Sequence, residues 1–514
     1  MTHFSDADKA QMAAKGISEQ RVEAQLERFR TGFPYLHIVA PATAGQGIMV
    51  ADDELTAACE ARWARYLADG GTVLKFVPAS GAASRMFKAL FAFVDGKDAT
   101  PAEGSPVADL LANIRKFAFY ADLNAALRRI HGKGVEELLA DGKAKEVVAG
   151  IILPEGLNYG ALPKALLKFH RYAAGKVRTA LEEQLVEAAE MSEGAPDVNV
   201  HFTVSSNHHT LFDKALANAI PVIEKETGRH FHVSLSEQKP STDTIAAAPD
   251  GEPFRDEEGK LVFRPGGHGA LIENLDDIDS EVVFIKNIDN IAAAELRGRS
   301  VPYKKLLGGM LMLVADRIES FIAAIKEGAD GAVLDEAERF CRMMLTLDGD
   351  ALGSDLPAAE RARALLAILD RPLRVCGMVR NEGEPGGGPY LAYSSDGSMV
   401  APQILESSQI DLSKPENKAM MASASHFNPV DLACRLRRAD GTSYDLADYV
   451  DPSTGFISEK SLNGRDLRAL ELPGLWNGAM SDWNTVFMEV PAYTFTPAKT
   501  VNDLLRPAHQ ADNK

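Results

Sequence analysis

The chain contains 514 residues, of which 46% are hydrophobic, enough for roughly two to four domains or one elaborated α/β domain. Its formal net charge of −18 argues against broad binding of nucleic acid or anionic membranes, although a few local cations can still hold a phosphate. The chain has four scattered cysteines, Cys59, Cys341, Cys376 and Cys434. They form no Cys-x-x-Cys pair, so neither a disulfide scaffold nor a structural zinc site is expected. Without a signal-peptide pattern or a membrane-length apolar run, we expect a cytoplasmic protein.

Residues 1–70 are expected to form a helical extension. Ser5 or Asp6 can cap a first helix, and Ser18 precedes a second with apolar residues at helical spacing. Residues 52–67 predict a third helix. The segment 33–44 contains two prolines and is expected to be a loop.

The stretch 73–88 combines an apolar run, a series of small residues and two cations. Residues 73–77 predict a buried strand, residues 79–84 are all small, and Arg85 and Lys88 follow. A small-residue loop lets the backbone approach a ligand, and a helix beginning there would favour anions. The spacing is not that of a P-loop, so a phosphate loop and an ordinary tight turn both remain open.

Strands and helices alternate through the rest of the chain. Residues 86–150 are expected to be helical without a strong strand, as are 211–219 and about 303–369. The expected strands are 198–205, 231–236, 281–286, 373–379 and 486–491. This order predicts a mostly parallel sheet covered on both faces, and polar loops follow several of these strands. Because ligands in such sheets bind at the carboxyl ends of the strands, we expect a site there.

The series of loops resembles the UTP:sugar-1-phosphate uridylyltransferases, the UDP-glucose or UDP-sugar pyrophosphorylase type, and within them a bacterial branch known as a domain of unknown function. The sharpest match is residues 490–505, where the family carries Val-Pro-x-x-x-Phe-x-Pro-x-Lys-Thr-x-x-Asp-Leu-Leu. Shorter matches occur in the family order: Pro163-Lys164, Glu237-Gln238, Pro265-Gly266-Gly267-His268-Gly269, Asn287-Ile288-Asp289-Asn290, Leu405-Glu406 and Phe427-Asn428.

The resemblance implies a Rossmann-like fold of the GT-A nucleotidyltransferase type. The α/β catalytic domain would span residues 71–514 after the extension 1–70, with a helical insertion at about 87–150. The chain departs from the family in two places. Its glycine loop is replaced by residues 79–84, closer to the Gly-x-x-x-Arg-Met start of bacterial sugar nucleotidyltransferases, and no left-handed β-helix follows Leu505.

The family reaction implies a role for each matched residue. A sugar-1-phosphate would attack a nucleoside triphosphate, most simply UTP, and pyrophosphate would leave, with Mg²⁺ as cofactor and no need for a strong base. Arg85, Lys164 and Lys499 would be catalytic cations, and Asp289 would hold the metal. The nucleotide phosphates would be bound by the small loop, Ala79, Ser80, Gly81 and Ala82. The base and ribose would be bound by Gln238, Gly266, Gly267 and His268. The sugar would be bound by Glu406 and Asn428.

Other interpretations stay open. Asp289 could cap a helix, Arg85 could pair with an acid, and Lys499 could be a solvated surface charge. The chain could also be a glycosyltransferase of the GT-A fold, or a non-catalytic nucleotide-sugar-binding protein. The pair His208-His209 lacks a second paired ligand, which does not favour zinc. The oligomeric state cannot be inferred from the sequence.

Overall fold

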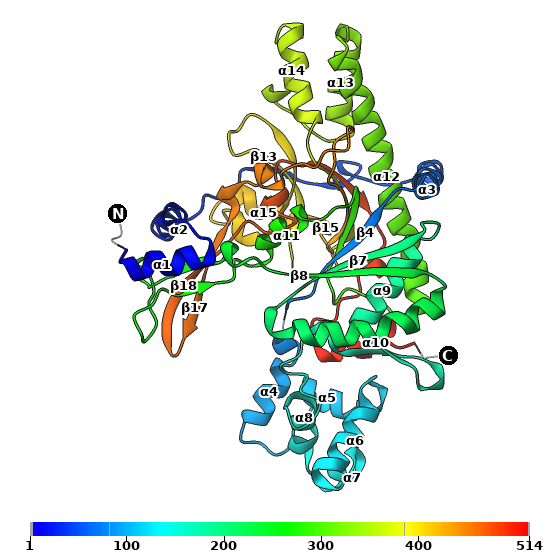
Figure 1. Cartoon of the computed structure of the whole chain (residues 1–514), viewed down its shortest axis with the longest axis vertical. Helices are drawn as coiled ribbons and strands as arrows, with labels where there is room; N and C mark the ends of the chain where they lie inside the picture. The colour runs from blue at the N-terminus through cyan, green and yellow to red at the C-terminus, as the bar shows by residue number, and fades with distance from the viewer. Residues whose placement is uncertain (1–3, 82, 385, 512–514) are drawn as a thin grey trace. The chain divides into compact units, whose positions relative to one another are not determined.

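The protein is described by a computed structural model that covers residues 4–81, 83–384 and 386–511. These residues form two compact units, and Figure 1 labels helices and strands of both. Unit 1 comprises residues up to Val73 together with 238–285 and 305–491, and unit 2 comprises 74–237, 286–304 and residues from Ala492 onward.

Unit 2 contains three parallel strands in the order β4 (Val73–Pro78), β7 (Asp197–Val204) and β8 (His230–Glu237). All three strands were predicted within one or two residues. Their apolar side chains join one core that also includes residues of α9 (Ala180–Met191) and α10 (His209–Thr227). The predicted helix 211–219 is therefore the middle of a longer one. Helix α9 was not predicted.

The helices expected over residues 86–150 are confirmed. They are α4 (Lys88–Asp95), α5 (Pro106–Ala112), α6 (Tyr120–His131), α7 (Val135–Ala140) and α8 (Ala144–Ile152). Helix α8 packs against α4, α6 and α7, and the group is visible in Figure 1. A short antiparallel pair, β5 (Lys168–Arg171) and β6 (Val177–Thr179), leads from these helices into α9.

Unit 1 contains the strand order β2-β3-β19-β12-β16-β11. The pairs β2–β3, β3–β19 and β19–β12 are parallel, whereas β12 and β16 are antiparallel. The bounds are β2 (Thr43–Ala44), β3 (Gly47–Met49), β19 (Asn484–Glu489), β12 (Leu373–Arg380), β16 (Asp431–Arg435) and β11 (Val282–Lys286), with β15 (His426–Phe427) also pairing with β12. The fold is therefore mixed α/β with mostly parallel main strands, as predicted.

Two smaller antiparallel sheets complete unit 1. One has the order β1 (Ile38–Pro41), β13 (Gly388–Tyr393), β14 (Val400–Leu405), and the other has the order β10 (Phe263–Arg264), β9 (Thr244–Ala247), β18 (Arg465–Glu471), β17 (Phe456–Leu462). The expectation of a loop over 33–44 is wrong, because β1 and β2 lie there. Pairing with β13, about 350 positions away in the chain, decides the conformation of β1, and its Pro41 is the last residue of an edge strand.

The three N-terminal helices are confirmed with their caps. They are α1 (Asp6–Lys15), α2 (Glu19–Thr31) and α3 (Asp53–Ala68), and the side chains of Ser5, Ser18 and Asp52 accept hydrogen bonds from their first turns. Helix α2 packs on β9 and β18, where Val22, Leu26 and Phe29 are buried. The segment 1–70 is thus helical in part and contains three short strands as well.

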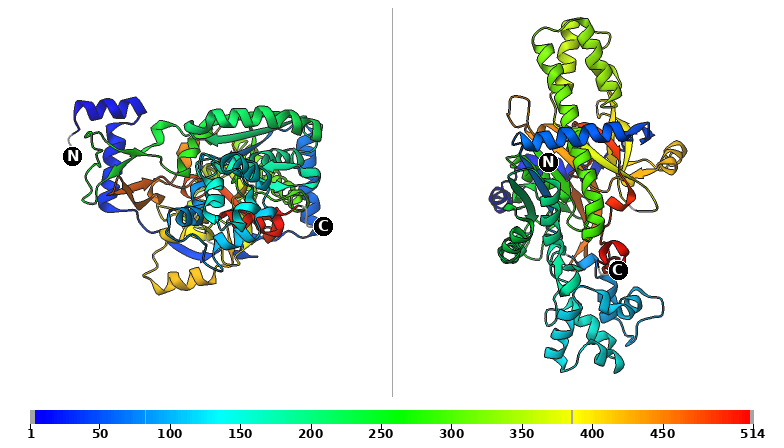
Figure 2. Two further views of the ribbon diagram at one scale, coloured as in Figure 1. Left: turned by 90° about the horizontal axis from the view of Figure 1, so that it is seen from below. Right: turned by 90° about the vertical axis from the view of Figure 1, so that its right-hand side faces the viewer.

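The remaining helices are α11 (Ile272–Asp276), α12 (Ala294–Lys326), α13 (Gly331–Met343), α14 (Ala358–Leu369) and α15 (Pro415–Ser423). They confirm the helical region expected at 303–369, although α12 begins nine residues earlier and contains Pro302. Helices α13 and α14 pack side by side, as the right-hand view of Figure 2 shows. Among the described residues, no helix is both long and apolar enough to cross a bilayer.

Candidate functional site

Three charged side chains from distant parts of the sequence meet in unit 2. Lys164 Nζ lies 2.7 Å from Asp289 Oδ2, and Lys499 Nζ lies 3.2 Å from the same oxygen. The Asp289 side chain is 8% exposed and that of Lys164 14%, whereas Lys499 is 58% exposed. The structure therefore brings together the predicted metal ligand and two of the three predicted catalytic cations.

Backbone hydrogen bonds hold the segments that carry these residues. Asp289 lies in the turn after β11, and its carbonyl accepts from the N–H of Ala498, 3.0 Å away. The neighbouring Asn290 side chain accepts from Thr496 N–H at 2.9 Å. Lys164 Nζ also donates to the Ala498 carbonyl at 2.9 Å. The lysine segment at 496–499 is thus fastened to the aspartate turn on both sides of the charge cluster.

A capping box fixes the other side of Lys499. The short 3-10 helix η14 (Val501–Leu505) begins after Thr500, whose side chain and that of Asp503 cap its first turn reciprocally. The Asp503 carboxylate accepts from the backbone N–H groups of Lys499 and Thr500, at 2.9 Å and 2.6 Å. Asp503, which the sequence motif contains, therefore orients the lysine backbone.

The small-residue loop after β4 belongs to the same part of unit 2. Ala83 N–H donates to the Leu162 carbonyl at 3.0 Å, directly before the Pro163-Lys164 pair. The carbonyl of Met86 accepts from Val501 N–H at 3.2 Å, directly after the Lys499-Thr500 pair. The loop is therefore hydrogen-bonded to both lysine segments. This contact favours a phosphate loop over an ordinary tight turn.

The loop residues differ in their accessibility. Ala79 is buried, whereas Gly81 is exposed, and a Cβ atom placed on Gly81 would meet no atom within 4 Å. Arg85 ends the 3-10 helix η1 (Ala83–Arg85) and is exposed, without an ion pair or hydrogen bond to any residue that the structure describes. Ala82 lies outside the described residues. Because the Arg85 side chain is exposed and the backbone at Gly81 is open, this loop is better suited to binding a bulky anion than to forming an internal ion pair.

The electrostatics of the cluster keep its carboxylate ionised. Burial would raise the pKa of Asp289, but the two ammonium groups of Lys164 and Lys499 outweigh burial and lower it. Two positive charges around one negative charge leave a net positive site at the ends of the strands. Such a site attracts phosphate groups in a protein that is acidic as a whole.

Side chains of helix α9 contact the turn that carries Asp289. The side-chain amide of Gln184 donates to the carbonyls of Asn287 and Ile288, at 3.1 Å and 3.2 Å. Glu187, one turn further along, pairs with Lys75 on β4 and with Lys286, which directly precedes the turn. These buried residues position Asp289. Among these supporting residues, Lys75 is recognisable in the sequence because it is a charge inside an apolar run. In contrast, Glu183, Gln184 and Glu187 resemble the polar residues of an ordinary surface helix.

A second buried network includes a residue near the end of the described chain. His170 contacts Glu183 through Nδ1 and His509 through Nε2, each at 2.9 Å, and Arg297 pairs with Glu183. His509 is 1% exposed and stacks on His170. This imidazole is buried because it has a polar partner inside the protein. The network anchors the segment that carries Lys499.

The residues predicted to bind base and ribose lie in unit 1. His268 stacks on Trp476, with ring centroids 4.4 Å apart and planes 11° from parallel. Its Nδ1 accepts from Leu475 N–H at 3.0 Å, so the proton of the neutral ring is on Nε2. Burial lowers the pKa of His268 to about 4, and the ring is therefore an uncharged donor at neutral pH. Trp476 thus packs against a predicted site residue.

The loop around His268 is packed closely. A Cβ on Gly266 would lie 2.6 Å from the Thr242 carbonyl oxygen, and Gly267 has φ +79°. Gln238, directly after β8, donates to Thr242 Oγ1 at 3.1 Å. The structure thus links Gln238 and the glycine loop through Thr242.

The two residues predicted to face the sugar also lie together in unit 1. Asn428 N–H donates to the Gly387 carbonyl at 2.8 Å, and a Cβ on Gly387 would lie 2.9 Å from a carboxylate oxygen of Glu406. The Asn428 side-chain nitrogen is buried without a hydrogen-bond partner in the described part of the chain. An acceptor and an unpaired donor beside a glycine suit the hydroxyl groups of a polyol.

The cluster of Lys164, Asp289 and Lys499 contains one carboxylate, that of Asp289. No group of three His, Cys, Asp or Glu side chains that could hold a metal occurs in residues 4–81, 83–384 and 386–511. His208 contacts Ser205 and the Ala161 carbonyl, and His209 pairs with Glu237, so both rings have ordinary structural partners. Asp289 alone fits Mg²⁺, which takes one or two carboxylates and completes its shell with phosphate oxygens.

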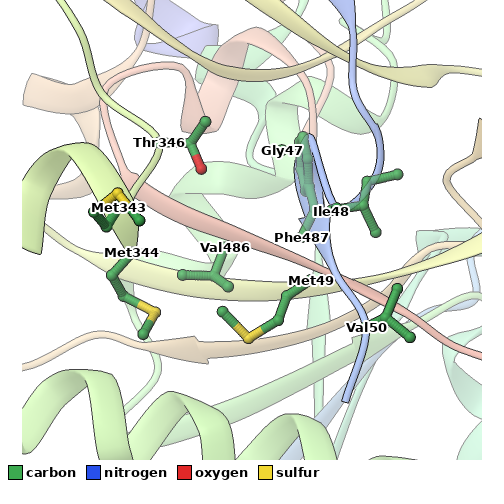
Figure 3. A pocket seen from close by; sticks show the side chains of 10 residues that line it. Gly47, Ile48, Met49, Val50, Met343, Met344, Thr346, Val486 and Phe487 are labelled. Carbon is green, nitrogen blue, oxygen red and sulfur yellow. The ribbon is translucent and has the colours of Figure 1, made fainter. Parts of the chain in front are cut away.

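A cavity elsewhere in unit 1 contains none of the predicted site residues. It has a volume of about 260 Å³ and is lined by β3, β19 and the chain after α13, with Met49, Met343 and Met344 around it (Figure 3). The residues that line it carry no charged side chain, and Met343 is 77% exposed. This cavity lacks the charges that a phosphate substrate requires.

Comparison with known proteins identifies one family and several solved structures. A family profile described as "Domain of unknown function (DUF4301)" matches residues 5–510. No curated protein matches the chain. Similar solved structures include the UDP-glucose pyrophosphorylase from Leishmania major, with 14% identity, 98% of this chain and 79% of that chain covered, and a TM-score of 0.43. Another is the uridine diphosphate N-acetylglucosamine pyrophosphorylase from Trypanosoma brucei, with 12% identity and a TM-score of 0.49. That comparison covers 98% of this chain and 80% of the other chain.

Proposed function

The chain belongs to the family described as "Domain of unknown function (DUF4301)", and on that premise we propose that it is a Mg²⁺-dependent nucleotidyltransferase. It joins a sugar-1-phosphate to a nucleoside triphosphate, with UTP as the first choice, and releases pyrophosphate. The observation that carries this proposal is the cluster of Lys164, Asp289 and Lys499 beside the small-residue loop of Arg85. The loop-by-loop resemblance to sugar-1-phosphate uridylyltransferases supports it.

The chemistry requires cations more than it requires a base. A phosphate oxygen of the sugar-1-phosphate forms a bond to the α-phosphorus, and the bond from that phosphorus to the β-phosphate bridging oxygen breaks. The nucleophile is already an anion, so the enzyme has to bring two polyanions together and stabilise the charge that develops. Lys164 and Lys499 contact the α-phosphate and the sugar phosphate, while Arg85 and the backbone of Ala79, Ser80 and Gly81 contact the β- and γ-phosphates.

Asp289 has two roles in this proposal. It orients the two lysines before substrate binds, and it is the protein ligand for Mg²⁺. The bound ion would neutralise charge on the phosphate oxygens. Because the described part of the chain offers one carboxylate here, the phosphates must supply most of the remaining ligands.

Substrate selection falls to a second set of residues. The uncharged His268 ring, Gln238 and the glycines Gly266 and Gly267 hold the base and ribose. The carboxylate of Glu406 and the unpaired amide of Asn428 hold the sugar hydroxyls. A site that pairs buried donors with substrate hydroxyls rejects analogues that lack them, because the donors would remain unsatisfied.

An assay of pyrophosphate release tests the proposal. The purified chain is incubated with Mg²⁺, each nucleoside triphosphate and a panel of sugar-1-phosphates. We expect release with at least one pair, and formation of the matching nucleotide-sugar by mass spectrometry. Binding of a nucleotide-sugar without any release would instead identify a non-catalytic binding protein, and sugar transfer from a nucleotide-sugar to an acceptor would identify a glycosyltransferase.

A further inference from the structure

Unit 1 contains a second cavity, larger than the one in Figure 3. Its volume is about 510 Å³, within the range of pockets that bind small organic molecules. It lies between α2, the segment after His268 and the end of β18. Its walls are mostly apolar, and the apolar lining includes Phe33, Ile272, Val450, Leu470, Leu472 and Pro473.

One face of α2 turns three hydrogen-bond donors into this cavity. Arg21, Gln25 and Arg28 all line it, and their spacing of four and three residues places them in one row on the helix. A row of this length extends about 10 Å at 1.5 Å per residue. The three side chains can therefore contact the same small ligand.

None of these donors has an acidic partner. Neither arginine forms an ion pair with a residue that the structure describes, and the Arg28 guanidinium lies 5.3 Å from the centre of the Phe33 ring instead. Gln25 is 7% exposed, and its Oε1 accepts from Ile245 N–H at 2.9 Å. Its Nε2 group has no hydrogen bond to the described residues. This amide lines the cavity beside two cations without ion pairs, so a ligand in the cavity can supply an acceptor to all three.

The charge balance of the cavity sets the sign of that ligand. Glu273 is the acidic side chain in the lining, and it forms no ion pair with Arg21 or Arg28. Two cations and one anion leave the charged part of the lining net positive, while much of the remaining lining consists of leucine, valine and proline side chains. A purely apolar molecule would leave the donors unsatisfied, and a simple inorganic anion would leave the apolar wall uncovered.

We propose that this cavity binds a small amphipathic organic anion. The acidic group of the ligand accepts hydrogen bonds from the row Arg21, Gln25 and Arg28, and its apolar body packs against Leu470, Leu472 and Pro473. The lining also includes Gly269 and Ala270, which follow His268 directly, so the ligand touches the glycine loop from the side of α2. The proposal does not depend on the nucleotidyltransferase activity.

Fluorescence of 8-anilinonaphthalene-1-sulfonate, an aromatic sulfonate, tests this proposal on the full chain. We expect saturable binding with a stoichiometry of one that excess UTP does not displace. The double variant Arg21→Ala with Arg28→Ala should weaken binding by about tenfold or more, the effect of losing charge-assisted hydrogen bonds. Ala24→Trp, which fills the cavity from an exposed position on α2, should abolish binding.

A matched control separates this site from general dye binding. Arg30 lies on the same helix and pairs with Glu27 and Glu252 outside the cavity, so Arg30→Ala should leave the affinity unchanged. Circular dichroism and thermal melting confirm that each variant is folded. Equal binding by the wild type and the Ala24→Trp variant would overturn the proposal. Equal affinity for the uncharged N-phenyl-1-naphthylamine would overturn the proposal that the ligand is an anion. Displacement of the dye by UTP would overturn the proposal that it binds in this cavity.

Discussion

The carboxylate of Asp289 lies 2.7 Å from the ammonium group of Lys164, although 125 positions separate the two residues in the chain. Lys499 approaches the same carboxylate from a segment 210 positions away in the other direction. Three loops thus converge on one buried acid. Neither Asp289 nor Lys499 lies in a helix or strand, so the cluster is more readily explained by function than by folding.

Removal of either lysine should reduce turnover more than it reduces stability. We expect Lys164→Ala and Lys499→Ala to lower kcat/KM for pyrophosphate release by about a hundredfold or more, as the loss of a group that stabilises developing charge does elsewhere. Lys499→Arg should retain part of the activity because it keeps the charge. Lys225→Ala, an exposed lysine on α10, is the control. Full activity of both alanine variants would place the site elsewhere.

His268 should remain uncharged throughout the physiological pH range. Burial lowers its pKa from 6.5 to about 4. Between these values the unfolded chain binds more protons than the folded one, so its contribution to stability is complete above pH 6.5 and is lost as the pH falls towards 4. Proton NMR of the imidazole, assigned with His268→Gln, should show no titration above pH 5. A midpoint near 6.5 would contradict the stacked, buried ring.

Glu183 should make unfolding steeply pH-dependent in acid. Burial alone would raise its pKa, but His170, Arg297 and Tyr172 lower it from 4.5 to about 2. The stability that this carboxylate contributes is present above pH 4.5 and is lost as the pH falls towards 2. The slope approaches about 1.4 kcal/mol per pH unit for one proton.

Urea unfolding at a series of pH values measures this slope. Glu183→Gln should be less stable at pH 6 and should show a flatter dependence between pH 4.5 and 3. The exposed Glu103 offers a control, because Glu103→Gln removes a carboxylate that has no ion pair with the described residues, and this variant should keep the wild-type slope. Identical slopes in wild type and Glu183→Gln would show that the Glu183 pKa is not lowered.

Two glycines on α12 should respond to alanine in opposite directions. A Cβ on Gly309 would lie 2.0 Å from the Cys59 carbonyl oxygen of α3, whereas a Cβ on Gly298 would meet nothing within 4 Å. Gly309→Ala should therefore reduce the free energy of unfolding by about 1–3 kcal/mol through overpacking. Gly298→Ala should raise it by about 0.5–1 kcal/mol, the helix-propensity difference. Thermal melts of the two variants compare them directly.

The sequence predicted the elements whose signal is local. The strands β4, β7, β8 and β12 were recognisable from apolar runs, and α1, α2 and α3 from their caps, because each signal lies within a few residues. Strand β1 was missed since its conformation depends on pairing with β13 far along the chain. Helix α9 was missed since buried glutamates on its face disguise its amphipathic pattern.

The candidate site divides in the same way. The motifs drew attention to Lys164, Asp289 and Lys499, but the geometry that joins them depends on contacts that no local pattern encodes. Gln184 and His509 support that geometry through side chains that are common on solvent-exposed surfaces, so nothing in their sequence context distinguished them. The position of Arg85 beside both lysine segments became apparent only through the backbone bonds of Ala83 and Met86.

The pairing of Asp289 with two lysines has a consequence for substrate capture. Because the carboxylate already occupies both ammonium groups, an arriving phosphate replaces a bound anion rather than water alone. In the proposed reaction, Asp289 would therefore compete with inorganic phosphate for the two lysines and weaken phosphate binding. A substrate that brings its own divalent cation gives the displaced carboxylate a new partner, which would make binding selective for metal-loaded triphosphates over free ones.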